Sequence, residues 1–92
     1  MAIKILSNDG MNVLYVYPGD SLIAAKFTSL NLANANFSNM QLQYAQFYNC
    51  NLNGANFSNS NLNAVKFINC IIESTNLNGV DSSNIFNTLD GK

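Results

Sequence analysis

The chain has 92 residues, of which 48% are hydrophobic and 10% charged, with a formal net charge of −1 and no histidine. This length fits a single domain, and a charge near zero offers neither the basic surface that nucleic acid requires nor a strongly acidic field. No nucleophile has a visible base and the carboxylates are scattered, so we expect no enzyme activity, no metal site and no cofactor. The carboxylates are Asp9, Asp20, Glu73, Asp81 and Asp90.

Residues 1–19 are predicted to form a strand hairpin. Two strand-like segments, 2–6 and 11–17, flank the turn residues Asn8-Asp9-Gly10, and Pro18-Gly19 ends the second segment. The end of a stack of short units exposes core side chains and backbone groups, so it must be covered. We expect the hairpin to cap the repetitive region that follows it, with Tyr17 over Phe37.

The second segment of this hairpin is apolar on both faces, and a single hairpin can bury only one of them. We therefore expect self-association through a cap, giving a homodimer. The sequence leaves open whether the two tyrosines belong to the first repeating coil. The candidate self-association residues are Val13, Tyr15, Val16 and Tyr17.

Residues 20–80 repeat with a period of five. A bulky apolar residue, here called the centre of its unit, occupies every fifth position without a miss. The residue two before each centre is mostly small or apolar, and the residue between them is mostly an amide or Lys. A period of five matches neither a helix nor a single strand and indicates stacked short units, each with an in–out–in segment followed by a corner. The centres are Leu22, Phe27, Leu32, Phe37, Leu42, Phe47, Leu52, Phe57, Leu62, Phe67, Ile72 and Leu77.

The units read Ala-Asn-Phe-Ser-Asn at 35–39 and 55–59, and Cys-Asn-Leu-Asn-Gly at 50–54. In these motifs the chain resembles the pentapeptide-repeat family. The resemblance covers about residues 20–80 and implies an all-β fold, a right-handed quadrilateral β-helix with four units per coil. It therefore implies about three coils, in which residues twenty apart stack on one another.

The implied stacking fits the choice of side chains. Leu and Phe centres alternate, so that columns of residues twenty apart are nearly pure in one type, and large centres have small inward neighbours. Cys50 and Cys70 fall at equivalent inward positions of adjacent coils. We expect both to be reduced core thiols, because parallel Cβ vectors at strand spacing suit a disulfide poorly.

Residues 81–92 are predicted to form a C-terminal cap. Asp81-Ser82-Ser83 has the character of a helix start, and Ile85, Phe86 and Leu89 follow at helical spacing. We expect a short helix or an irregular turn over the last coil, with Phe86 as the plug.

The outward positions carry mostly Asn and Ser, with one exception. On the four-sided arrangement, apolar and aromatic side chains gather around one edge, flanked by two lysines, and such a grouping marks a candidate contact site. We therefore predict a non-catalytic protein-interaction or structural module with an unknown protein partner. The candidate patch is Ile23, Lys26, Tyr44, Tyr48, Lys66 and Ile68.

Three other functions remain open at this stage. Some larger members of the family mimic duplex DNA and bind type II topoisomerases, but this chain lacks the acidic ladders that mimicry needs. A flat surface for ice or another ligand, and a plain structural block, are the other two. With no targeting signal and no apolar run long enough for a membrane span, we expect a cytoplasmic protein that contacts neither membrane nor nucleic acid.

Overall fold

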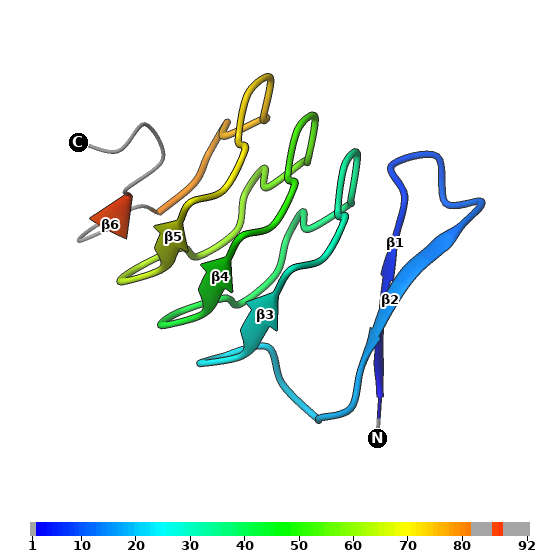
Figure 1. Ribbon diagram of the computed structural model, residues 1–92, viewed down its shortest axis with the longest axis horizontal. Helices are drawn as coiled ribbons and strands as arrows, with labels where there is room; N and C mark the ends of the chain where they lie inside the picture. Colours follow the sequence, from blue (N-terminus) through cyan, green and yellow to red (C-terminus); the bar gives the residue numbers. More distant parts are fainter. Residues whose placement is uncertain (1, 82–85, 88–92) are drawn as a thin grey trace.

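The computed structural model describes residues 2–81 and 86–87, and within them all regular structure is β. The strands form two sheets (Figure 1). An antiparallel pair joins β1 to β2, and a parallel sheet follows in the order β3-β4-β5-β6. No helix among these residues could cross a membrane. The strands are β1 (Ile3–Leu6), β2 (Val13–Tyr17), β3 (Lys26–Thr28), β4 (Gln46–Tyr48), β5 (Lys66–Ile68) and β6 (Phe86–Asn87).

The parallel sheet pairs residues that are twenty apart in the sequence. Phe27 aligns with Phe47, and Phe47 with Phe67. Single bridges with the same spacing, such as Asn31 to Asn51 and Gln41 to Asn61, connect the chain elsewhere around each coil. The predicted stacking of residues twenty apart is thereby confirmed, and the successive coils run side by side in Figure 1.

The core consists of the centres and their inward neighbours. Every centre from Leu22 to Phe67 is at most 5% exposed. The rings of Phe27 and Phe47 stack with centroids 4.8 Å apart, and those of Phe37 and Phe57 with centroids 5.1 Å apart. Between the two columns the rings meet edge to face, as with Phe37 and Phe47 at 5.8 Å. Both arrangements are favourable for aromatic pairs and add to the free energy gained from burying their area.

The corner residue, two after each centre, has a positive φ in all twelve units, between 54° and 75°. Most corners are Asn, Ser or Gly, which adopt this conformation most readily or bond their own backbone. The residue before the centre completes many corners. For example, Asn36 Oδ1 accepts the N–H of Ser38 at 3.0 Å, and Asn56 Oδ1 accepts that of Ser58 at 2.9 Å. Asn is therefore abundant because it closes corners.

Two kinds of corner occur. Most units also close with an N–H three residues after the centre bonded to the carbonyl of the centre, as from Ala35 to Leu32 at 3.0 Å. In the β3 and β4 units the carbonyl of the centre instead accepts a thiol from the next coil. Cys50 donates to Phe27 at 3.5 Å and Cys70 to Phe47 at 3.2 Å. The β3–β5 side thus has three-residue strands and a different corner.

The hairpin covers the first coil, as predicted. Ile5 is fully buried, and the N–H of Asn36 donates to the carbonyl of Leu6 at 2.7 Å. The expected contact of Tyr17 with Phe37 is wrong in its partner. Tyr15 and Tyr17 both pack on Phe27, with ring centroids 6.0 and 5.7 Å away, because β2 lies over the β3 side of the coil.

At the other end, β6 replaces the expected helix at the two residues described there. Phe86 pairs with Lys66, and Asn87 with Phe67, so the twenty-residue register continues. The rest of the segment predicted as a helix, 82–85 and 88–89, lies outside the described residues, as does the side chain of Phe86. Burial of the centres weakens towards this end: Ile72 is half-buried and Leu77 is 51% exposed.

Candidate interaction surfaces

The first candidate surface is the outward side of β3, β4 and β5, called here the strand face. The register places its side chains in two columns that run across the strands. Lys26 and Lys66 are exposed, whereas Tyr48 and Ile68 are half-buried. The columns are Lys26, Gln46 and Lys66, and Thr28, Tyr48 and Ile68.

The strand face is locally positive in a chain that is negative overall. Residues 23–29, 43–49 and 63–69 contain two lysines and no Asp or Glu, against a net charge of −1 for the whole chain. Lys26 Nζ lies 5.2 Å from the centroid of the Tyr48 ring, and the Tyr48 hydroxyl donates to Gln46 Oε1 at 2.7 Å. These contacts hold the tyrosine in place while both ammonium groups stay accessible.

The remaining two patch residues lie at the adjacent corner. Ile23 is 46% exposed and Tyr44 is 60% exposed. The N–H of Ala24 donates to the carbonyl of Gln43 at 2.8 Å, which brings these two corners together in neighbouring coils. All six residues predicted for the patch therefore lie on one side of the molecule.

Tyr44 has a backbone conformation that disfavours its side chain. Its φ is +64°, and the equivalent corners in the coils before and after are Ala24 and Ala64, at +61° and +62°. A positive φ costs a residue with a Cβ about 1–2 kcal/mol. At this column the chain thus has three residues that are poorly suited to a corner, and the middle one is a large exposed aromatic.

The second candidate surface is the outer side of the hairpin. Val13 is 51% exposed and Val16 46%, and Met11 beside them is 81% exposed. The predicted self-association set therefore divides. Val13 and Val16 face outward, whereas Tyr15 and Tyr17 pack against the core. Met11 was missed because its place next to the turn gave no reason to prefer one direction for its side chain.

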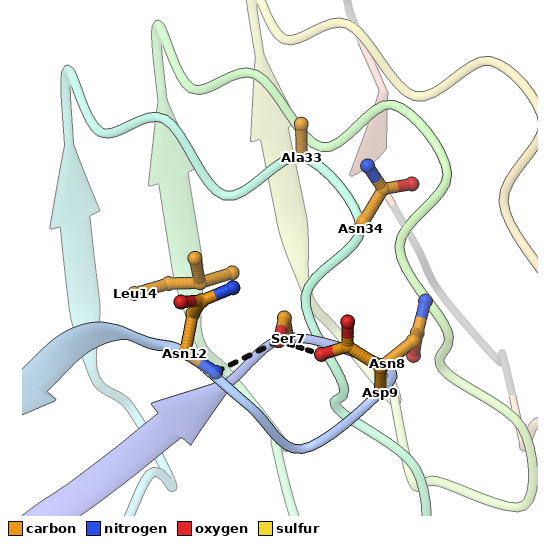
Figure 2. A pocket seen from close by; sticks show the side chains of 7 residues that line it. All are labelled: Ser7, Asn8, Asp9, Asn12, Leu14, Ala33 and Asn34. Carbon is orange, nitrogen blue, oxygen red and sulfur yellow. Dashed lines mark hydrogen bonds between the residues drawn. The ribbon is translucent and has the colours of Figure 1, made fainter.

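A groove of about 450 Å³ lies between the hairpin turn and the first coil (Figure 2). Its polar groups serve one another. Ser7 Oγ donates to Asp9 Oδ1 at 2.5 Å and accepts the N–H of Asn12 at 3.2 Å. The bonds from Ser7 and from the Met11 N–H lower the pKa of Asp9. The groove therefore stabilises the turn. Its lining residues are Ser7, Asn8, Asp9, Asn12, Leu14, Ala33 and Asn34.

The two cysteines have no arrangement suited to chemistry. Both are free and only 2% exposed, as predicted, and both donate to carbonyl oxygens. A hydrogen bond with the Cys50 thiol, together with burial, raises the pKa of Cys70. Within the described part of the chain, no group of three or more His, Cys, Asp or Glu side chains could hold a metal ion.

A comparison with protein families matches the model of the pentapeptide repeat region to residues 21–87. The chain belongs to the pentapeptide-repeat family. Among solved structures it is similar to a pentapeptide repeat protein, Rfr23, from the cyanobacterium Cyanothece 51142, with 31% identity and a TM-score of 0.53. The match covers 67% of this chain and 46% of that one, so this chain spans less than half of the protein it resembles. No curated protein matches the sequence.

Membership of the pentapeptide-repeat family suggests a structural or protein-interaction module, and none of these comparisons points to catalysis.

Proposed function

We propose that this pentapeptide-repeat protein is a right-handed, four-sided β-helix of about three coils that binds another protein through its strand face and the adjoining Tyr44 corner. The four-sided coil is supported by the spacing of the bridges, which begin at Lys26, Asn31, Asn36 and Gln41 and recur twenty residues later. The rigid stack presents the patch without a change in backbone shape, which reduces the entropy lost on binding.

The observation that carries the proposal is the contrast between this side and the rest of the coil. Elsewhere the outward columns contain mainly Asn and Ser that close corners, such as Asn36, Asn56 and Asn76. The strand face has two exposed lysines, and at its edge are an exposed Tyr and an exposed Ile. Tyr is enriched at protein interfaces, where its ring is buried while its hydroxyl stays hydrated.

Charge defines the partner further. Lys26 and Lys66 have no carboxylate among the neighbouring residues 23–29, 43–49 and 63–69, so a complementary surface supplies acidic groups and an apolar contact for Tyr44. Two lysines are too few for the phosphate contacts of a nucleic-acid site. The described carboxylates form no acidic column either, which disfavours DNA mimicry. The module is placed in the cytoplasm, where buried thiols such as Cys50 and Cys70 remain reduced.

The test is a pull-down from cells of the source organism with three forms of the protein. The wild type should retain a specific partner, and the double variant Lys26→Glu with Lys66→Glu should lose it. Lys4→Glu is the control, because Lys4 is also exposed but lies on the hairpin. Retention by the double variant as strong as by the wild type would exclude the strand face as the binding site. No specific partner for any form would favour a plain structural block.

A further inference from the structure

The free edge of β2 is the second feature that points to a function. β2 pairs with β1 on one side, and among the residues that the structure describes no strand lies on its other side. Such an edge offers backbone N–H and C=O groups to any other strand, and proteins usually protect it with a charge, a proline or a bulge. Here the charge, Lys4, and the register shift between Ile5 and Leu6 are both on β1. Residues 11–17 contain neither a charge nor a proline.

The surface next to this edge is apolar. Val13 and Val16 of β2 are about half exposed, and Met11 is 81% exposed. The inner side of the same hairpin is already occupied, because Tyr15 and Tyr17 pack on Phe27. A partner strand would therefore extend a sheet whose inner side is supported by the core, and would cover Val13 and Val16 on the outer side.

The chain has no segment of its own that can reach this edge. Residue 1 directly precedes β1, and residues 82–85 connect two described residues at the opposite end of the stack. Residues 88–92 follow β6, which is separated from β3 by three pairings of strands, or about 14 Å. Five extended residues span at most about 17 Å, so nothing remains to pair with β2 beyond the first coil.

We propose that the occupant is a second copy of this chain, whose β2 pairs antiparallel with the first β2 to give a four-stranded sheet across a two-fold axis. An isologous pairing needs a strand that tolerates itself. In any antiparallel register of residues 13–17 only neutral side chains face one another, so no like charges oppose the contact. The sheet edge and three apolar side chains are smaller than a standard interface of about 800 Å² per partner, so we expect a micromolar dimer.

The test begins with the wild-type chain, measured by sedimentation equilibrium from about 5 to about 200 µM, a range that brackets micromolar affinity. The mass should rise from 10.1 kDa towards twice that value. Val16→Lys places like charges beside the paired strands and should weaken the dimer at least about tenfold. Thr28→Lys is the matched control, because Thr28 is also an exposed strand residue but lies on the strand face, and it should leave the dimer unchanged.

Amide hydrogen exchange at low and high concentration identifies the contact independently of either variant. Amides of residues 13–17 should gain protection with concentration, and those of β3, β4 and β5 should not. A wild type that stays monomeric at 200 µM overturns the proposal, as does a folded Val16→Lys variant that dimerises like the wild type. Protection that rises on the strand face instead would place the second copy there and would equally exclude the β2 edge.

Discussion

The strand face and the Asn-rich sides are built on the same five-residue period, but they differ in how they close their corners. At Asn36, Asn56 and Asn76 the side chain bonds the backbone of its own unit and so is committed to the fold. At the equivalent positions of the strand face stand Lys26, Gln46 and Lys66, and the centre carbonyls of the β3 and β4 units are satisfied from inside by thiols. Moving the polar partner into the core releases the outward side chains for contact with another molecule.

The largest expected effect tests the core that both kinds of side share. Phe47→Ala removes a fully buried ring that contacts both aromatic columns, and should lower the free energy of unfolding by about 3–5 kcal/mol. Asn56→Ala removes one corner bond and should cost about 0.5–1.5 kcal/mol. Urea unfolding measures both. Equal losses would mean that the inward and outward positions differ less than the packing indicates.

A corner glycine on an Asn-rich side should be the next most sensitive position. Gly54 has a φ of +75°, and a Cβ there would collide with the Oδ1 of Asn34 in the preceding coil. Gly54→Ala should therefore cost about 1–3 kcal/mol, from the strained φ and the displaced Asn34. Gly10 has the same φ but open space around it, so Gly10→Ala isolates the cost of the backbone conformation. Thermal unfolding should rank Gly54→Ala as the more harmful; identical shifts would remove the role of Asn34.

The thiols of the strand-face units should matter as hydrogen-bond donors. Cys50→Ala leaves the carbonyl of Phe27 without this partner and should cost about 1–3 kcal/mol, whereas Cys50→Ser keeps a donor and should cost less. Ser60 is a natural precedent, because its buried hydroxyl donates to the carbonyl of Phe37. Denaturant titration of the pair measures the difference. If Ala and Ser were equally tolerated, filling of space alone would explain the cysteine.

The smallest effect separates stability from binding. Tyr44→Asn gives the corner a residue that accepts its positive φ more readily, and should raise the free energy of unfolding by about 0.5–1 kcal/mol. The same change should weaken retention of the partner in the pull-down. Ala24→Asn, at the equivalent corner of the preceding coil, should stabilise to a similar extent without affecting binding. A Tyr44→Asn protein that binds as well as the wild type would leave the tyrosine without a role at the surface.

Much of this fold could be predicted from the period of five. The period identifies the centres, and their burial follows from packing alone, as at Phe37 and Leu52. The lid was harder, since no local pattern says at which angle Pro18 and Gly19 deliver the hairpin, and Tyr17 meets Phe27 and not Phe37. The helical spacing near Phe86 was outweighed by the pairing of that residue with the edge of β5.

The candidate surface could be predicted only in part. Outward positions follow from the repeat, so the sequence grouped Tyr44 with Tyr48 and both lysines. It could not reveal that the β3 and β4 units close their corners by a thiol, because this depends on the contact of Cys50 with Phe27 in the coil before it. Nor does the sequence of residues 13–17 show which edge of the hairpin is left unpaired, since that depends on where β1 meets the first coil.

The columns of stacked Phe rings restrict how such a gene can change in length. Duplication or loss of twenty residues returns every side chain to its own column, so that Phe still stacks on Phe as Phe27 does on Phe47. An insertion of five residues shifts all later units by one position and brings Phe beneath Leu throughout the interior. Length should therefore vary between homologues in steps of whole coils, and a longer version would keep the same lid and the same lysine-bearing side, repeated further along.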